Sequence, residues 1–148
     1  MAELGLPDWP YGMKDMVRFS ELDPLNHVNN AAYLSWFETA RIGYIMEYGL
    51  TGMTHTDADP QIVVRRQVVD YLKPIFFGET YVTAMRTTRI KPSSLTMEYG
   101  VFVGTEVRAT GETVIVSLSQ DGRARQPWRT EAIALMIERD AAKPVGFD

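Results

Sequence analysis

The chain of 148 residues has the length of one domain, and a hydrophobic content of 45% is enough to fill one core. The 15 Lys and Arg residues against 19 Asp and Glu give a net charge of −4, which argues against general binding of nucleic acid or anionic membranes. The absence of cysteine excludes disulfides, thiolate nucleophiles and cysteine metal sites. Because no secretory signal or apolar membrane span is evident, we expect one cytoplasmic domain over residues 1–148 without membrane insertion.

The N-terminal part of the chain carries weak signals for regular structure. Residues 1–12, which include Pro7 and Pro10, are expected to form an irregular lead-in. Residues 14–19 are expected to form a short strand. A loop rich in turn-forming residues follows over residues 20–30.

The strongest predicted element is a helix over residues 30–48. Asn29 and Asn30 are favourable N-cap residues, and Gly49 follows the last periodic position as a stop signal. Apolar residues recur at steps of three and four and extend beyond one narrow stripe: Tyr33, Phe37, Ala40, Tyr44 and Tyr48, joined by Leu34, Trp36, Ile42 and Ile45. We therefore expect a core helix that the rest of the chain wraps.

The hydrophobic period changes to two after residue 60. Strands are expected at residues 62–72, 81–89, 95–103 and 113–120, separated by turn signals that contain Gly or Pro. Short turns between consecutive strands favour an antiparallel meander. A short helix is expected at residues 130–139, within a C-terminal segment, residues 127–148, that ends in a tail. This order indicates an α+β fold, a curved five-stranded antiparallel sheet with one long helix packed on it.

The predicted sheet has more apolar surface than one helix can cover. Strands between residues 81 and 120 carry apolar or aromatic residues on both faces, because Phe102 and Ile115 add to Val101 and Val114. Exposed edges and a partly apolar second face favour association with another copy of the chain. We expect a homodimer at least, with a homotetramer left open.

Two residues with reactive side chains precede the predicted helix. Asp23 and His27 lie just before a helix N-terminus, which has unpaired backbone N–H groups and a partial positive charge. That end can hold the oxyanion of an attacked carbonyl, and a carboxylate beside it can act as base or nucleophile. Because no Ser or Cys nucleophile accompanies them, an already reactive carbonyl such as a thioester is the favoured substrate.

The run FSELDPLNHVNNAAYLSWFETARIGYI resembles the signature of the 4-hydroxybenzoyl-CoA-type acyl-CoA thioesterases, which have the hotdog fold. The resemblance continues through VVDYLKPIFFGETYVTAMRTTRIKPSSLTMEYGV and covers about residues 17–120. Its most specific part is Asp-x-x-x-His-Val-Asn-Asn followed by Tyr33 and by Glu38 and Arg41. It implies a sheet wrapped around a long central helix, and two subunits that join their sheets with the active site at the interface.

The resemblance also implies roles for residues of the loop. Asp23 would attack the thioester carbonyl or activate a water, and both possibilities stay open. The backbone N–H of Asn30 would polarise the carbonyl. His27 joins the candidate catalytic group, but its position varies in the family and a structural hydrogen bond is the alternative. Asn26 replaces a common Gly, and Asn tolerates the left-handed backbone that such a turn needs.

Substrate-binding candidates follow from the same resemblance. In the resembled family, the region matching Arg89, Lys91, Ser93 and Ser94 contacts the coenzyme A nucleotide from the partner subunit. Arg86 belongs to the same group, and Tyr33 is a candidate for the acyl pocket. After the last strand, Arg123, Arg125 and Arg129 form a second basic cluster, and either cluster could hold the coenzyme A phosphates. No cofactor is expected apart from the coenzyme A of the substrate. No metal is expected either, because a polar loop explains His55, Asp57 and Asp59 better.

The sequence therefore predicts a homo-oligomeric thioesterase that hydrolyses an acyl-CoA to free acid and coenzyme A. The alternative is a non-catalytic hotdog module that binds acyl-CoA or an acyl carrier protein, and the intact Asp23 counts against it. A hotdog hydratase or dehydratase is disfavoured, because its motif with another Asp-to-His spacing is missing. Glu38 and Arg41, three residues apart on the helix, are expected to form an ion pair. The acyl group is left open.

Overall fold

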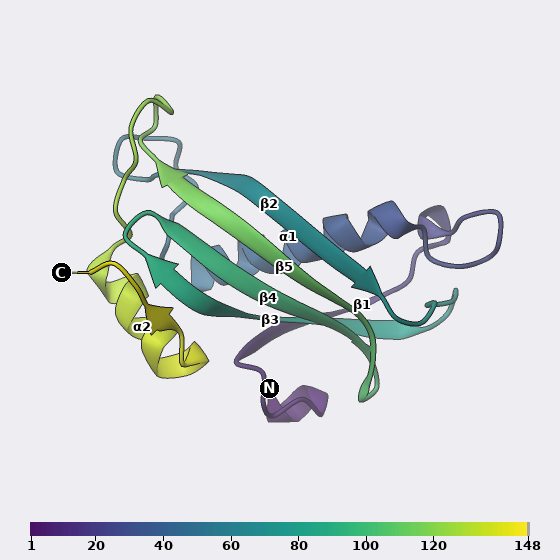
Figure 1. Ribbon diagram of the computed structural model, residues 1–148. Helices are drawn as coiled ribbons and strands as arrows, with labels where there is room; N and C mark the ends of the chain where they lie inside the picture. Colours follow the sequence, from purple (N-terminus) through teal and green to yellow (C-terminus); the bar gives the residue numbers. More distant parts are fainter. Residues whose placement is uncertain (148) are drawn as a thin grey trace.

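The computed structural model describes residues 1–147 and consists of one curved sheet crossed by a long helix (Figure 1). The long strands are β1 Tyr11–Met16, β2 Gln61–Tyr71, β3 Thr80–Lys91, β4 Ser94–Val103 and β5 Glu106–Leu118. The helices are α1 Asn30–Glu47 and α2 Thr130–Asp140, with short 3-10 helices at Ala2–Leu4 and Phe19–Glu21. A short strand, β6 Lys143–Pro144, pairs parallel with β3. The α+β class is confirmed.

The sheet order is β1-β3-β4-β5-β2, with β6 beside β3. The expected meander is confirmed for β3, β4 and β5, but it is wrong for β2, which pairs with β5 and forms the far edge. The connection from β2 to β3, residues 72–79, contains Pro74 and is too long for a tight hairpin. The sheet also has six strands instead of five, because part of the C-terminal tail is β6.

The sheet curves around α1. Irregular pairing at Val64/Arg66, Thr87/Arg89 and Val101/Phe102 introduces β-bulges, which bend strands and increase their twist. In Figure 1, α1 runs along one face of the sheet and crosses its strands obliquely. The helix begins where the sequence predicts, because the Asn29 side chain accepts a hydrogen bond from the backbone N–H of Ala31 at 2.8 Å.

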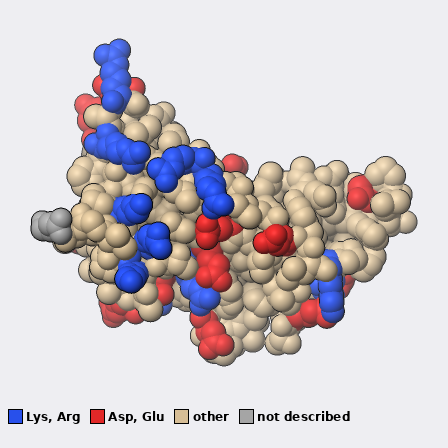
Figure 2. Space-filling view, viewed as in Figure 1, with Lys and Arg blue, Asp and Glu red and all other residues tan. Residues whose placement is uncertain are grey.

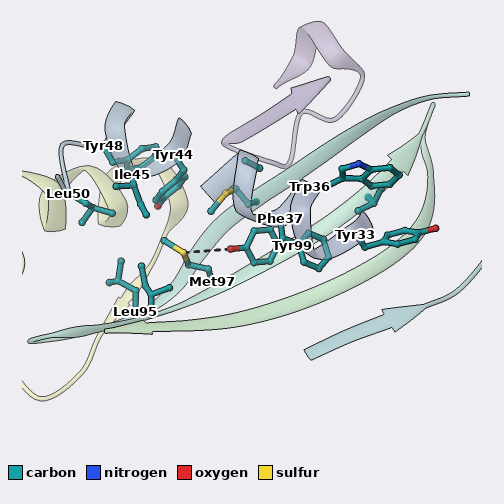
Figure 3. Close-up of a cluster of buried hydrophobic side chains, with 14 of the residues drawn as sticks. Tyr33, Trp36, Phe37, Tyr44, Ile45, Tyr48, Leu50, Leu95, Met97 and Tyr99 are labelled. Carbon is teal, nitrogen blue, oxygen red and sulfur yellow. Dashed lines mark hydrogen bonds between the residues drawn. The ribbon is translucent and has the colours of Figure 1, made fainter. Parts of the chain in front are cut away.

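The core lies between α1 and the sheet. Phe37 is fully buried and stacks on Tyr99 of β4, with ring centroids 4.5 Å apart (Figure 3). Trp36 stacks on Tyr81 of β3, with ring centroids 3.7 Å apart. The opposite face of α1 is uncovered, since Leu34, Ile42 and Met46 are 44%, 37% and 54% exposed. The expectation of a fully wrapped helix is therefore wrong for a single chain, which covers α1 on one side.

The N-terminal segment packs on the outer face of the sheet. Leu6 is buried against Val82, and Trp9 meets Phe102 edge to face at 5.9 Å. β1 begins at Tyr11, earlier than the expected residue 14, so the irregular lead-in is shorter than predicted. Part of the apolar second face is thus covered by the chain itself and not by another copy.

Helix α2 is fixed to α1 and β3 by one buried carboxylate. Asp140 accepts hydrogen bonds from the hydroxyls of Tyr44 and Tyr48 and, at 2.8 Å, from the backbone N–H of Thr87. Burial raises the pKa of Asp140 above the ordinary aspartate range, against the lowering effect of these hydrogen bonds. Within residues 1–147, neither helix is long and apolar enough to cross a membrane.

Candidate active site

Asp23 lies in a tight loop immediately before α1. Its Oδ1 accepts hydrogen bonds from the backbone N–H groups of Leu25 at 2.9 Å and His27 at 3.2 Å. The backbone N–H of Asp23 donates to the carbonyl of His27 at 2.8 Å, which closes the loop. Asn26 takes a φ of 62°, the left-handed conformation expected at this position. Among the described residues no group bonds to Oδ2, so this oxygen is available to a substrate or water.

The N-terminus of α1 supplies the matching donor. Asn29 is the N-cap, and its side chain satisfies the N–H of Ala31. The N–H of Asn30, the first helical residue, has no acceptor in residues 1–147. Asp23 and Asn30 line one surface hollow of about 210 Å³. The structure therefore brings together the carboxylate and the backbone donor that the sequence predicted.

The hollow has further walls on the end of β2 and the turn after it. Tyr33 lines it as predicted, and its ring packs edge to face on Tyr71 at 5.1 Å. Burial and the neighbouring Tyr71 raise the pKa of Tyr33 to about 12, so its hydroxyl stays protonated at neutral pH. Tyr71 and Lys73 also line the hollow and were not predicted. The only signal for them was their place in the VVDYLKP run that carries the resemblance.

Two contacts hold this wall in place. The Tyr71 hydroxyl donates to the backbone carbonyl of Asn30 at 3.0 Å, which ties the end of β2 to the start of α1. Arg108 donates to the carbonyl of Pro74 at 2.7 Å and forms an ion pair with Glu79 at 3.0 Å. The Arg108 guanidinium holds the pKa of Glu79 below its usual range. The turn that borders the hollow is therefore fixed by Arg108 of β5, which pairs with Glu79 at the end of that turn.

His27 has a mainly structural environment. Its backbone pairs with Phe76 in an isolated bridge, and its ring meets the Phe76 ring edge to face at 5.2 Å. The imidazole borders the same hollow as Asp23, but no described residue forms a side-chain hydrogen bond with it. The ring can contact a substrate at this site, while its backbone shapes the Asp23 loop.

Three of the predicted phosphate-binding residues gather in a second hollow, on the outer face of the sheet. Arg89, Lys91 and Ser94 line it together with Arg65 and Lys143, and its volume is about 480 Å³. Figure 2 shows Lys and Arg side chains concentrated over this end of the sheet, where β3 ends and β4 begins. Four cations around one hollow can hold phosphate groups by charge-assisted hydrogen bonds. We call this space the basic hollow.

Other candidate cations have structural partners. Arg86 pairs with Glu98 at 3.3 Å and lies over the Trp9 ring at 4.4 Å. Arg129 pairs with the buried carboxylate of Asp59 at 2.7 Å. Hydrogen bonds from Gly52 and Thr54, and then from Arg129, hold the pKa of Asp59 well below its usual range. These two arginines therefore stabilise the lead-in and the loop over residues 50–60.

Ser93 lies beside the basic hollow and does not line it. Its hydroxyl accepts a hydrogen bond from Arg125 at 3.3 Å. Arg125 is thereby placed near the turn between β3 and β4, whereas no described residue pairs with the Arg123 side chain. In residues 1–147, no three or more His, Asp and Glu groups are arranged to hold a metal ion.

A third space, of about 340 Å³, separates the second half of α1 from the first half of β2. Its walls include Glu38 and Arg41 and several apolar side chains, namely Ile42, Ile45, Ile62 and Ile115. We call it the α1–β2 cavity. It has the size of a small ligand pocket and lies on the same face of the sheet as α1.

One chain does not bring the Asp23 hollow and the basic hollow together. Ser94 is level with Val63, and Arg89 is level with Arg66, so the basic hollow lies beside the first half of β2. The Asp23 hollow lies at Tyr71, five to eight residues further along this strand, which is roughly 16–26 Å at 3.3 Å per residue. Figure 1 shows the same separation between the loop before α1 and the turn between β3 and β4.

A curved antiparallel sheet around one helix, with a carboxylate and a backbone donor at the helix N-terminus, defines the class of thioesterase-like hotdog proteins. Residues 17–136 match the sequence model of the thioesterase-like superfamily, and the chain belongs to this family.

Individual relatives agree with this assignment. The uncharacterized protein YsmA of Bacillus subtilis is 32% identical over 119 residues, 80% of this chain and 79% of YsmA. A thioesterase superfamily structure from Jannaschia sp. CCS1 superposes with a TM-score of 0.91 at 32% identity, covering 97% of this chain and 92% of that one. A thioesterase from Thermus thermophilus, solved with coenzyme A and Zn, gives a TM-score of 0.75 at 34% identity, covering 90% and 96%.

Proposed function

We propose that this protein hydrolyses the thioester of an acyl-CoA to the free acid and coenzyme A. The observation that carries the proposal is the hollow shared by Asp23 and Asn30, where a carboxylate oxygen and a helix N–H are both without partners in residues 1–147. A relative that was solved with coenzyme A supports this class of substrate.

The chemistry follows from the positions of these two groups. The thioester oxygen accepts a hydrogen bond from the Asn30 N–H, and the partial positive charge of the α1 N-terminus stabilises the oxyanion that forms. Asp23 either removes a proton from the attacking water or attacks the carbonyl itself and is released by water. In both routes the C–S bond breaks and one water is consumed: its hydroxyl oxygen ends in the free acid or, if water attacks the Asp23 side of an anhydride, in Asp23, and its proton converts the leaving thiolate to the coenzyme A thiol.

We propose that the working unit is a homodimer, or a homotetramer built from it. Within one chain the Asp23 hollow lies five to eight residues along β2 from the level of the basic hollow, roughly 16–26 Å at 3.3 Å per residue. β2 is an edge strand, so a second copy can pair with it antiparallel. If the two strands pair about their middles, the end of one β2 lies beside the start of the other, and Asp23 of one copy approaches the end of the partner's sheet that carries the basic hollow on its outer face.

In this assembly the substrate bridges two chains. Arg89 and Lys91 of the basic hollow hold the phosphates of coenzyme A, with Ser93 and Ser94 beside them. Tyr33 borders the reacting carbonyl from the chain that supplies Asp23. The cations at the phosphates contribute binding energy that does not depend on the acyl group. The acyl group lies closer to α1 than the phosphates do.

A thiol-release assay tests the proposal directly. Wild type, Asp23→Asn and Asp23→Ala are compared on aromatic, short and long acyl-CoAs with a disulfide-exchange dye, to which this chain adds no thiol of its own. We expect wild-type release that falls at least 100-fold in both variants with the fold retained. Asp8→Asn is the matched control, because Asp8 is exposed in the lead-in, away from α1.

Two results would contradict the proposal. Coenzyme A ester binding without release by wild type would show the non-catalytic module that binds acyl-CoA or an acyl carrier protein. Release that survives both Asp23 substitutions would keep the enzyme class and remove Asp23 from its role.

A further inference from the structure

Arg41 is a buried cation without a counter-ion in its own chain. The residue is 6% exposed, and its one hydrogen bond in residues 1–147 goes from Nη1 to the hydroxyl of Tyr99 at 3.2 Å. It takes part in none of the ion pairs formed by the described residues, so the expected pair with Glu38 is absent. A buried guanidinium that lacks a carboxylate is costly, which indicates that something outside this chain compensates its charge.

Glu38 lies three residues before Arg41 and also lines the α1–β2 cavity, but it is exposed, on the uncovered side of α1. Leu34, Glu38, Ile42 and Met46 follow one another at steps of four residues, so they form one stripe along the helix. All four are exposed, and three are apolar. Val64 of β2, 48% exposed, also borders the α1–β2 cavity with Ile42, so the apolar surface continues from the stripe to the sheet edge. A continuous apolar surface beside an unpaired edge favours a protein partner.

The positions of α1 and β2 place Glu38 and Arg41 near the centre of this surface. The two elements lie side by side in opposite directions: the start of α1 is bonded to the end of β2 through Tyr71, and Ile45 and Gln61 line the same α1–β2 cavity. The middle of α1 is therefore level with the middle of β2. If the two β2 edges pair antiparallel about their middles, the two-fold axis passes through that level.

We propose that Glu38 of each chain enters the α1–β2 cavity of a second copy and is the counter-ion of its Arg41. The contact is reciprocal about the two-fold axis, as a self-complementary interface requires, and the apolar stripe surrounds it. The cavity of about 340 Å³ has room for the incoming carboxylate, and Arg41 already lines it. The inference rests on the proposed pairing of β2 edges and does not depend on whether the assembly hydrolyses a thioester.

Charge reversal in separate chains tests the contact. Glu38→Arg and Arg41→Glu are purified alone and then mixed, and mass is measured by analytical ultracentrifugation. Each variant alone places like charges at the axis, so we expect monomers. The mixture restores two opposite-charge contacts, and we expect a one-to-one heterodimer. A pair formed within one chain gives no such rescue, so the mixture separates the two arrangements.

A second, neutral substitution tests the same contact if Arg41→Glu does not fold. Glu38→Gln changes an exposed side chain and leaves the single chain intact, but it removes both counter-ions from the dimer. We expect its dimer dissociation constant to rise on the order of 100-fold, with unchanged circular dichroism. Glu138→Arg, at an exposed position near the end of α2, is the matched control and should dimerise like wild type.

The outcomes separate this inference from the proposed activity. A monomeric wild type, a dimeric Glu38→Arg, or an unchanged dissociation constant in Glu38→Gln would overturn the reciprocal pair, whatever the thiol-release assay shows. A wild-type dimer that behaves as expected in the mixing experiment but releases no thiol would overturn the proposed hydrolysis alone.

Discussion

Gly111 of β5 allows α1 to lie close to the sheet, and replacing it by alanine tests that packing. A Cβ atom at this position would lie 2.6 Å from Cε2 and 2.8 Å from Cζ of Phe37, and 3.2 Å from the carbonyl oxygen of Val68. Phe37 is fully buried and stacked on Tyr99, so its ring has no free space to move into. Gly111→Ala must therefore displace the ring or lift α1 from the sheet.

The expected cost follows from two opposing contributions. Overpacking of a filled core costs about 1–3 kcal/mol. Replacing glycine by alanine reduces the entropy of the unfolded chain, which stabilises the protein by about 0.4–1 kcal/mol. We expect Gly111→Ala to lower the free energy of unfolding by about 1–2 kcal/mol, measured by urea denaturation with an unchanged slope.

A second substitution identifies the cause of the loss. Phe37→Leu removes the ring that the new methyl group strikes, so it should lower stability alone but rescue part of the Gly111→Ala defect. We expect a favourable coupling energy of about 1 kcal/mol between the two changes. If Gly111→Ala is neutral, or if the two effects simply add, the contact between Phe37 and Gly111 does not limit how closely α1 packs.

Three further outcomes are expected. Tyr71→Phe removes the hydrogen bond to Asn30 at 3.0 Å, so unfolding free energy should fall by about 1 kcal/mol in urea titrations and kcat should fall several-fold. Asn26→Ala should lower thioester hydrolysis and cost about 1 kcal/mol, whereas Asn26→Gly retains both, because φ is 62°. The pKa of Asp140 is raised by burial, so folding favours its protonated form, and wild type should lose stability as the pH rises from about 3.9 to the raised pKa. Asp140→Asn should not show this loss in urea titrations across that range.

Local patterns were sufficient to predict the helix and the catalytic loop. The capping Asn29 and the stop at Gly49 define α1 without reference to the rest of the fold, and the observed helix ends within one residue of the prediction. Asp23 and Asn30 belong to one short continuous segment, so their proximity needs no knowledge of the sheet. The resemblance then added the expected chemistry to groups that were already close in sequence.

Contacts between distant segments were harder to predict. β2 has a pattern that fits any strand, and this pattern does not distinguish pairing with β5 from pairing with β3. The spacing of Glu38 and Arg41 permits an ion pair, but spacing does not reveal that Arg41 is buried and bonded to Tyr99 while Glu38 is exposed. The separation of Asp23 from the basic hollow likewise appears only when the register of three strands is known.

If the active site is completed by a partner, the register between the two β2 edges becomes part of the catalytic geometry. Backbone hydrogen bonds repeat along an edge and do not select one register, and a slip of one residue turns every side chain to the opposite face. Such a slip also moves Asp23 by about 3.3 Å relative to the partner's phosphate-binding residues. Misplacement of about 1 Å can already cost 100-fold in rate, so a side-chain contact that selects one register is needed. A charged pair at the two-fold axis meets this need, because only one register brings each Glu38 to the Arg41 of its partner.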